Sequence, residues 1–464
     1  MENDCKALTL DDGTVIECVR TLRNLPGRRL VFEGRFKGRR VVVKVFMNRQ
    51  RAQVHSQREV DGLAALNSAG IAAPEVLFAG SDRQANPVVV LAWIENAVAL
   101  SARWHDADPE QRVQLARRMM ALLASHHRAG IFQADLHLDN FLVGEDLIYT
   151  LDGDAVVARA HPLDESRSQQ NLALYCSQLG ADLDPLSLQQ SAYYARLRDW
   201  DEAGLARRLP GLIDAARSYR WRKLRSKIFR DCSAVAHSKT ATQVSFTVRA
   251  YGPGLPDFLA GLDASCPADP VRRLKNGNTA TVWRVDFGGR QLVVKRYNVK
   301  NRLHGIMRTL KESRASISWR NAHMLGMFGI TTPAPVALLI RRAGWFRPVA
   351  YFVAEDVSGP SLLEWVGENQ DDLARVRQAA VQVGRLFSQL QLLRISHGDM
   401  KASNFILGPE GLVVVDLDAM QQHRWRSGFE RAWRRDMARF AANWLDRPKV
   451  QEIMHAEIRS AAVN

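Results

Sequence analysis

Three polar residues recur in this chain with the same spacing in two places. Each set contains an aspartate, an asparagine five residues later and a second aspartate twelve residues after that. The sets are Asp135, Asn140 and Asp152, and then Asp399, Asn404 and Asp416. In phosphoryl transfer, one carboxylate takes the proton of the attacking hydroxyl, while an amide and a second carboxylate hold magnesium against the phosphates. The repeated spacing therefore predicts two tandem units with residues for this chemistry.

The first set assigns a role to each of its residues. Asp135 is the predicted catalytic base, and Asn140 and Asp152 are the predicted metal ligands. Asp154 follows Asp152 by two residues, so it either shares the metal or closes a turn. Carboxylate and amide oxygens suit Mg²⁺, which is a hard cation.

The second set has the same order of roles. Asp399 is the predicted base, and Asn404 and Asp416 are the predicted metal ligands, with Asp418 as the residue that shares the metal or closes the turn. Lys401 lies two residues after the base and is predicted to contact the transferring phosphate.

Each unit also has a lysine near the end of a predicted strand, where it could hold the nucleotide phosphates. In the first unit this residue is Lys44, and Glu59 on the following helix is its predicted partner. In the second unit it is Lys295, and its partner stays open. Glu312 fits by its distance from the lysine, and Asn321 fits by its position on the helix.

A turn of small residues before the lysine strand would let the backbone approach the phosphates closely. Gly277, within residues 275–282, is predicted to bind the nucleotide in this way in the second unit. Residues 25–29 offer only a weak counterpart in the first unit. The predicted cofactors are ATP and Mg²⁺.

Hydrophobic patterns follow the same order in both halves of the chain and predict strands followed by a helical part. In the first half, strands are expected at 29–46 and 87–94, helices at 50–67 and 109–129, and a hairpin at 141–157. In the second half, strands are expected at 281–297 and 350–355, helices at 313–327 and 373–393, and a hairpin at 405–420. This order predicts an α+β fold class with two bilobal domains, each with a small β-rich N-lobe and a helical C-lobe.

The predicted domains are residues 1–240 and 241–464. Small residues, Pro and Gly cluster at about 234–270, which is the predicted linker or the start of the second domain. The chain of 464 residues is long enough for two such cores.

Composition favours a globular cytoplasmic protein. Hydrophobic residues make up 46% of the chain and charged residues 24%. No apolar run of about 18 residues predicts a transmembrane helix, and the acidic first residues lack the apolar stretch of a secretory signal. The five cysteines are far apart and form no CxxC pair, so neither a disulfide framework nor a zinc site is predicted.

The formal net charge is +15 and is distributed unevenly. Lys and Arg exceed Asp and Glu by 4 in residues 1–240 and by 11 in residues 241–464. Such an excess attracts anionic glycans, anionic lipids or nucleic acids. No recognition motif accompanies the pI of 9.9, so a nucleic-acid partner is not expected.

Residues 217–230 carry seven basic residues and no acidic one, with Trp221, Leu224, Ile228 and Phe229 interleaved. Two interpretations stay open. The helix could lie on an anionic membrane surface or bind an anionic acceptor, or its apolar side could be part of a core while its basic side is solvated. Residues 424–435 raise the same choice.

The two loops and their flanking segments resemble the lipopolysaccharide core kinase (Kdo/WaaP) family, a branch of the protein-kinase-like fold. HGDMKASNFIL, VVVDLDAM and RRDMARFAANWL carry the resemblance in the second half, and QADLHLDNFLV and LDGDAV carry it in a more diverged copy. The resemblance covers about 25–160 and 270–450. It implies two tandem protein-kinase-like domains, with Gln133 and Ala134 replacing the usual His-Gly before the first base.

The resemblance also implies a function. Members transfer the γ-phosphate of ATP to a heptose or Kdo hydroxyl of the lipopolysaccharide inner core. The expected partners are this core or another anionic glycan, and the expected location is the cytoplasm, peripheral at the inner face of the inner membrane. At least one of the two domains is expected to be active.

Other functions stay open. A protein Ser/Thr kinase is one, although no APE-like segment or activation loop follows Asp152 or Asp416. A paired pseudokinase scaffold in lipopolysaccharide assembly is another, since either copy could have lost activity.

Overall fold

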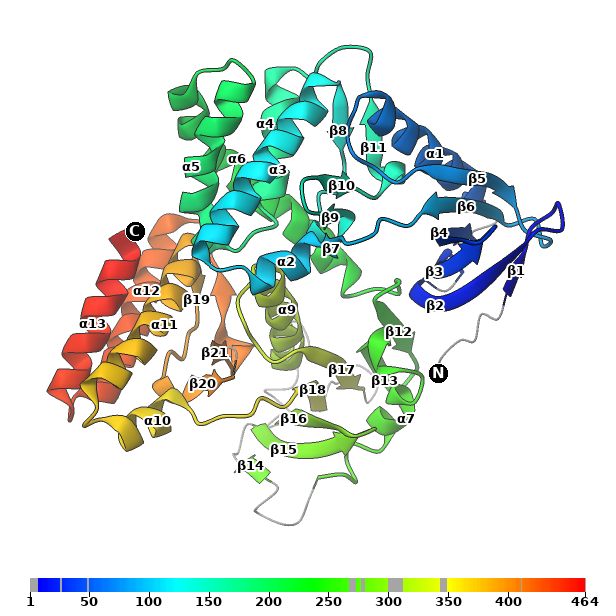
Figure 1. Cartoon of the computed structure of the whole chain (residues 1–464). Coiled ribbons are helices and arrows are strands. Elements are labelled where there is room, and N and C mark those ends of the chain that lie inside the picture. The colour runs from blue at the N-terminus through cyan, green and yellow to red at the C-terminus, as the bar shows by residue number, and fades with distance from the viewer. Residues whose placement is uncertain are drawn as a thin grey trace. The chain divides into compact units, whose positions relative to one another are not determined.

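Two compact units make up the chain in the computed structural model, which describes residues 7–25, 27–47, 50–266, 273–276, 280–298, 312–342, 349–409 and 411–463. One unit contains residues 1–179 and 183–218, and the other contains residues 180–182 and 219–464. We call them unit 1 and unit 2. Each combines an antiparallel sheet with a helical part (Figure 1). The predicted α+β class is therefore confirmed.

The N-lobe of unit 1 is a six-stranded sheet in the order β1-β2-β3-β4-β6-β5. Its strands are β1 (Ala7–Thr9), β2 (Val15–Leu25), β3 (Arg29–Phe36), β4 (Arg39–Phe46), β5 (Val76–Ser81) and β6 (Pro87–Ala92). The strand pair expected at 29–46 is β3 and β4. Lys37 and Gly38 join them with φ of 49° and 76°, so both turn residues are left-handed, as a two-residue hairpin requires.

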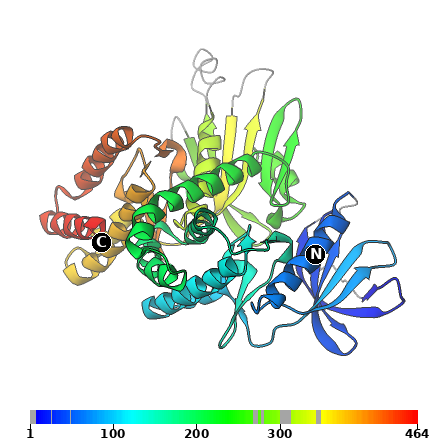
Figure 2. The ribbon, with the colours of Figure 1, turned by 90° about the horizontal axis from the view of Figure 1, so that it is seen from above.

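Helix α1 (Ala52–Ser68) covers this sheet (Figures 1 and 2). Its inner side also contacts η2 (Gly153–Ala155), and no side chain separates the two backbones where they meet. This turn belongs to residues 151–156, which, with residues 413–420 of unit 2, we call the metal segments. A Cβ on Gly62 would lie 2.1 Å from the Gly153 carbonyl oxygen, and a Cβ on Gly153 would lie 2.2 Å from that of Glu59. Glycine at both positions allows α1 to hold Glu59 beside the metal segment.

The C-lobe of unit 1 packs its helices around one apolar core. The elements are β7 (Val98–Ala99), α2 (Leu100–Asp106), α3 (Pro109–Arg128), β8 (Ile131–Gln133), β9 (Phe141–Val143), β10 (Ile148–Thr150), β11 (Val156–Ala158), α4 (Glu165–Cys176), α5 (Asp184–Leu197) and α6 (Glu202–Lys227). The long helix expected at 109–129 is α3, which begins with Asp108 and Gln111 in a capping box. The loop with the predicted base Asp135, which we call the base loop, follows α3 at residues 134–140, between β8 and β9.

The N-lobe of unit 2 is a seven-stranded sheet in the order β12-β13-β17-β18-β16-β15-β14. Its elements are β12 (Val235–Lys239), β13 (Gln243–Val248), α7 (Leu255–Ala260), β14 (Arg273–Asn276), β15 (Ala280–Phe287), β16 (Arg290–Asn298), α9 (Arg314–Met327), β17 (Pro335–Arg341) and β18 (Val349–Glu355). The expected hairpin at 281–297 is β15 and β16, joined by Gly288 and Gly289 with φ of 58° and 79°.

The C-lobe of unit 2 is again helical (Figure 1). Its elements are α10 (Leu362–Asn369), α11 (Leu373–Leu392), β19 (Ile395–Ser396), β20 (Phe405–Gly408), β21 (Gly411–Val414), β22 (Gln421–Gln422), α12 (Arg426–Ala441) and α13 (Pro448–Val463). Trp221 and Ile228 of the basic stretch are buried in the core of this unit. The apolar side of residues 217–230 therefore packs into a core, and most of its basic side chains are exposed.

The change from one compact unit to the other falls at residues 218–219, within α6. Residues 234–270, where the sequence places the linker or the start of the second domain, contain β12, β13 and α7, and β12 and β13 form one edge of the unit 2 sheet. The domain limits at 1–240 and 241–464 stay predictions.

No helix within the described residues is both apolar enough and long enough to cross a lipid bilayer.

The close contact between α1 and η2 predicts an unusual response to alanine. Gly62→Ala should destabilise the full chain by about 1–3 kcal/mol, because the new methyl group overlaps a backbone carbonyl. Gly211→Ala, in α6 of the same unit, is the control, since its Cβ would meet no atom within 4 Å. It should be neutral or stabilising by about 1 kcal/mol. Urea unfolding measures both, and equal effects would contradict the contact.

Candidate active sites

The base loop of unit 2 is closed by a hydrogen bond between two of the predicted site residues. The Nδ2 of Asn404, in η6 (Ala402–Asn404), donates to the backbone oxygen of Asp399 at 2.8 Å. Gly398 has φ of 81°, and a Cβ there would lie 2.5 Å from the Ala419 carbonyl oxygen. This backbone therefore requires glycine immediately before the base.

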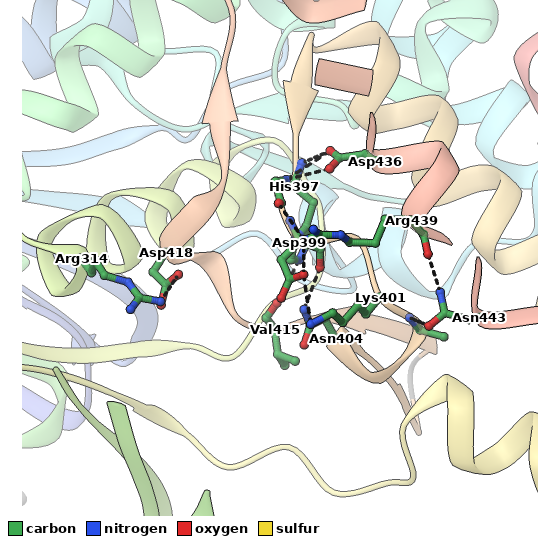
Figure 3. Close-up of polar contacts among 12 residues, drawn as sticks. Arg314, His397, Asp399, Lys401, Asn404, Val415, Asp418, Asp436, Arg439 and Asn443 are labelled. Carbon is green, nitrogen blue, oxygen red and sulfur yellow. Dashed lines mark hydrogen bonds and ion pairs between the residues drawn. The ribbon is translucent and has the colours of Figure 1, made fainter. Parts of the chain in front are cut away.

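Helix α12 and the 3-10 turn that follows it, η8 (Ala442–Trp444), hold the backbone of this loop with one side chain each, seven residues apart (Figure 3). The carboxylate of Asp436 accepts hydrogen bonds from the backbone N–H of His397 at 2.7 Å and of Gly398 at 3.0 Å. Asn443 Oδ1 accepts from the backbone N–H of Ala402 at 3.3 Å. The buried Asp436 thus fixes the residues on the N-terminal side of the base, and Asn443 fixes those on its C-terminal side.

His397 joins the base loop to the metal segment. Its Nε2 donates to the Val415 carbonyl oxygen at 3.1 Å, and its Nδ1 accepts from the backbone N–H of Asp399 at 3.4 Å. Burial lowers the pKa of His397, and the nearby acceptors only partly oppose this. The imidazole is therefore neutral, and its two hydrogen bonds connect the base loop to the metal segment.

The carboxylate of Asp399 lies between two cations. Arg439 of α12 donates to Oδ1 at 2.5 Å, and Lys401 Nζ lies 3.3 Å from the same oxygen. Burial raises the pKa of Asp399, but Lys401 and Arg439 outweigh this effect, and the pKa is lower than usual. The base is consequently ionised, as acceptance of a proton requires.

Lys295 lies at the centre of a second charge cluster in unit 2. Its Nζ donates to Asp416 and, at 2.7 Å, to Asp418. Arg314, the first residue of α9, donates to both oxygens of Asp418 at 2.9 and 3.0 Å (Figure 3). Burial opposes the charge of Lys295, but Tyr297, Asp416 and Asp418 together outweigh it and raise the pKa of the lysine. The ammonium group is therefore fully charged.

Glu312, one of the two candidate partners of Lys295, is paired elsewhere: its carboxylate accepts from Arg320, while Lys295 is paired with Asp416. Glu312 as a nucleotide-binding residue stays a prediction. Asn321, the other candidate, uses its Nδ2 to donate to the backbone oxygens of Leu417 and Met420, both at 2.9 Å. It fastens α9 to the metal segment and, among the described residues, makes no hydrogen bond to the lysine.

An Ile-x-x-Pro sequence after each helix gives the correct match between α1 and α9. Ile71 and Pro74 align with Ile330 and Pro333, and this offset places Ser318 at the position of Glu59. The same offset matches His55 to Arg314 and Gly62 to Asn321, and both members of each pair contact equivalent parts of the metal segment. Ser318 is buried and bonded to the Tyr297 hydroxyl at 2.9 Å. Unit 2 has therefore replaced the helix glutamate by a serine.

The lysine of unit 1 has the partner that the sequence predicts. Lys44 Nζ lies 2.5 Å from Glu59 Oε1 and also donates to the Leu151 carbonyl oxygen at 3.4 Å. Burial raises the pKa of Glu59, the charge of Lys44 opposes this, and Asp152 adds to it. A fully buried carboxylate thus depends on Lys44 for its charge balance.

The second carboxylate of each metal segment is bound by a basic side chain from the helix. His55 Nδ1 lies 2.8 Å from Asp154 in unit 1, in the place where Arg314 meets Asp418 in unit 2. Asp154 and Asp418 as metal ligands stay predictions, and the structure gives each of them a different partner. Asp418 also pairs with Lys295, as Glu59 pairs with Lys44 in unit 1.

The first carboxylate and the asparagine of unit 1 fit a magnesium ion. Asp152 Oδ1 is buried and has no hydrogen-bond partner among the described residues. Asn140 donates through Nδ2 to the Asp135 carbonyl oxygen at 3.0 Å, which leaves its amide oxygen for a metal. The described residues contain no group of three His, Cys, Asp or Glu suited to a metal. Two protein ligands completed by phosphate oxygens and water are typical of Mg²⁺.

The base loop of unit 1 keeps its closure but has weaker anchors. Gln133 takes the place of the histidine, and its Nε2 donates to the Asp152 carbonyl oxygen at 3.3 Å. Asn171 takes the place of Asp436 and donates to the Gln133 carbonyl oxygen at 2.8 Å. An amide here reverses the direction of the contact and removes the negative charge. Asp135 is exposed.

A cavity of about 400 Å³ lies between the lobes of unit 2 and contains part of this site. Lys295, Val415 and Asp416 line it, together with apolar residues of the sheet such as Val293 and Phe352. Its size is in the usual range for small-molecule sites. Gly277, the predicted nucleotide-binding glycine, lies outside the described residues.

Comparison with known proteins gives one family and several solved structures. The model of the lipopolysaccharide kinase (Kdo/WaaP) family matches residues 37–201 and 267–456. A structure of WaaP in complex with acyl carrier protein is 21% identical, covers 42% of this chain and 88% of its own, and has a TM-score of 0.33. The M. tuberculosis PknI kinase domain is 13% identical, covers 45% and 98%, and has a TM-score of 0.30. Comparison with curated proteins finds no match.

The fold and the two loops define a tandem protein-kinase-like protein, as the sequence predicts. The chain belongs to the lipopolysaccharide kinase (Kdo/WaaP) family, because the family model matches most of its length in two segments, each with one base loop. The protein is thus a kinase of the lipopolysaccharide kinase family.

Four residues of the unit 2 site were missed by sequence analysis: Arg314, Asp436, Arg439 and Asn443. The last three lie at helical spacing in RRDMARFAANWL, in α12 and the turn η8 that follows it, so their polar types were a usable signal. Alignment of this segment with residues 169–180 matches Asp436 to Asn171 and Arg439 to Leu174, which would have shown where the two units differ.

The pairing of Lys295 predicts that Asp418 positions this lysine in place of a helix glutamate. Asp418→Asn should lower kcat/KM for ATP by about 10- to 100-fold, because Lys295 then has only the carboxylate that is also needed by the metal. The matched variant, Asp154→Asn, leaves the Lys44–Glu59 pair intact and should leave kinase activity within about threefold. Steady-state kinetics with ATP, together with thermal unfolding of both variants, tests this. Unchanged kinetics in a folded Asp418→Asn protein would refute the role.

Proposed function

We propose that unit 2 transfers the γ-phosphoryl group of ATP to a sugar hydroxyl, on heptose or Kdo, in the inner core of lipopolysaccharide. One observation carries the choice of unit 2. Its base, Asp399, is ionised and held by α12, and it belongs to the same lobe interface as the cavity lined by Lys295 and Asp416. Family membership supports the lipopolysaccharide substrate class.

The proposed mechanism gives each side chain of unit 2 one task. Lys295 holds the nucleotide phosphates, and Asn404 and Asp416 hold Mg²⁺, which neutralises charge on the phosphates when it is bound. Asp399 orients the sugar hydroxyl and accepts its proton. Lys401 is half-exposed and close enough to the base to contact the transferring group. Catalysis is then mostly positioning and charge neutralisation, with no covalent protein intermediate.

We propose a second nucleotide site in unit 1. The Lys44–Glu59 pair and the unpartnered Asp152 Oδ1 support it, since both are arranged for phosphate and metal. Asp135 lacks a charged partner among the described contacts, and its loop lacks the Asp436-type anchor, so unit 1 is the less suited to transfer. Nucleotide binding with little or no turnover is the role that this geometry supports.

We propose a cytoplasmic location with a peripheral position at the inner face of the inner membrane. The acceptor class and the surplus of basic residues in 241–464 support this location. The alternatives are a protein Ser/Thr kinase, with a protein hydroxyl as acceptor, and a scaffold with two inactive units. Both alternatives make different predictions in the assay below.

Substitution of the two bases distinguishes the units. Asp399→Ala should lower phosphate transfer to purified core oligosaccharide by about 10²- to 10⁴-fold, because the acceptor hydroxyl loses its base. Asp135→Ala should retain transfer within about threefold. Radiolabelled ATP measures transfer, and a casein-like protein serves as the alternative acceptor. Loss of activity in Asp135→Ala alone would assign catalysis to unit 1, preference for casein would favour a protein kinase, and no transfer would favour the scaffold.

Nucleotide binding is tested separately in each unit by its lysine. Mg-ATP should raise the melting temperature, with a gain of about 2.7 kcal/mol in stability at a hundredfold excess over Kd. Lys44→Met and Lys295→Met should each remove part of the shift, and the double variant should remove it all. Chelation of Mg²⁺ by EDTA should reduce the shift in every protein that has one. A full shift in the double variant would exclude both sites.

A further inference from the structure

Arg439 makes the shortest contact to the predicted base and helps to keep it ionised, but the mechanism above gives it no contact with a substrate. Its Nη1 lies 2.5 Å from Asp399 Oδ1 and 3.4 Å from the Gly398 carbonyl oxygen. About half of its side chain is exposed, at 49%, whereas the Asp399 side chain is exposed by 27%. The guanidinium group is therefore accessible to a molecule that approaches the base.

Two neighbouring polar residues, one in α12 and one in η8, already anchor the loop. Asp436 is 3% exposed and bonds two backbone N–H groups, and Asn443 bonds a third. Arg439 is the member of this set that bonds a side chain and reaches the surface. An anchoring role alone does not explain why a charged group lies there.

The position of Arg439 also separates it from the nucleotide site. It is absent from the residues that line the Lys295 cavity. In Figure 3 it approaches Asp399 from the side opposite to Arg314 and Asp418, which belong to the lysine cluster. The acceptor must approach Asp399 from outside the nucleotide cavity, so Arg439 is on the acceptor side.

Unit 1 lacks this cation. Leu174 aligns with Arg439, and His137 aligns with Lys401, so the Asp135 carboxylate has no arginine beside it among the described residues. The contrast coincides with the loss of the other anchors in unit 1. The arginine thus accompanies the unit whose site is otherwise complete.

We infer that Arg439 is an acceptor-binding residue that receives a carboxylate or phosphate group of the sugar whose hydroxyl is phosphorylated. This inference rests on the proposed sugar-kinase function and specifies its substrate as an anionic sugar. Arginine presents a planar fork of N–H donors that matches both anions in a bidentate manner. In the structure, one nitrogen of this fork, Nη1, contacts Asp399 Oδ1.

The geometry suggests how the contact would change when the acceptor binds. Arg439 turns from Asp399 toward the anion of the sugar, and this movement frees one carboxylate oxygen for the hydroxyl. Lys401, 3.3 Å from the same oxygen, still balances the charge of Asp399. The acceptor anion is held by α12, which also holds the base loop, so both reaction partners share one rigid support.

The test compares Arg439→Gln with wild type on matched acceptors: core oligosaccharide, the same oligosaccharide with reduced carboxyl groups, and the same oligosaccharide after removal of phosphate. Arg439→Gln should raise KM for the intact acceptor by about 10- to 100-fold, the range of a charge-assisted hydrogen bond, with a smaller change in kcat and none in KM for ATP. Arg439→Lys should recover part of the loss. Removal of the recognised carboxylate or phosphate from the acceptor should raise the wild-type KM as much as Arg439→Gln raises it on the intact acceptor. Wild type and variant should then have the same KM for the modified acceptor.

Controls separate this role from charge and structure. Arg426→Gln removes one positive charge from the same helix at an exposed ion pair and should leave KM unchanged. Equal loss on intact and neutralised acceptors, or an unchanged KM, would overturn the inference. The acceptor arm that abolishes the difference identifies carboxylate or phosphate as the ligand.

If wild type transfers phosphate to no glycan, the proposed function fails. Titration of the oligosaccharide into both proteins then still decides the inference. Weaker binding by Arg439→Gln supports it, and equal binding refutes it.

Discussion

A buried ammonium group near the end of a central strand needs negative charge beside it, and the two units meet this need in different ways. In unit 1 the charge comes from Glu59 on helix α1, which is close to Lys44 because Gly62 and Gly153 let the backbones touch. In unit 2 it comes from Asp416 and Asp418 on the metal segment. Other differences around the two lysines follow from this choice. The helix that no longer supplies a carboxylate supplies Arg314 to Asp418.

Local pattern was enough to predict the elements next to the two loops, but not the strands β12 and β13, which lie where the sequence suggests a linker. The β3–β4 and β15–β16 hairpins follow from alternating residues around left-handed turns, and Lys44 and Glu59 lie where strand and helix spacing places them. The partner of Lys295 could not be predicted in the same way. It comes from residues more than a hundred positions later, and the helix residue that should have paired with it is a serine. Comparison between the two copies was the missing step.

The base loops show how tertiary anchors separate two similar sequences. Both asparagines close their loops with the same bond to the backbone of the base, at 3.0 and 2.8 Å. The next contacts differ, because Asp436 accepts from two N–H groups while Asn171 donates to a carbonyl. Gly398 has a left-handed backbone, whereas Ala134 is not among the residues with positive φ. The helix that follows each loop therefore distinguishes the copies more clearly than the loop itself.

The salt link between Lys295 and Asp416 has a consequence for how the site of unit 2 is filled. An empty pocket with an unbalanced carboxylate would attract any divalent ion from solution. Here a tethered internal counter-ion already occupies that carboxylate, so a bare metal must displace it without compensation. At the nucleotide site proposed for unit 2, phosphate groups would take the place of Asp416 beside Lys295 and would leave this carboxylate for Mg²⁺. Metal and nucleotide would then bind together.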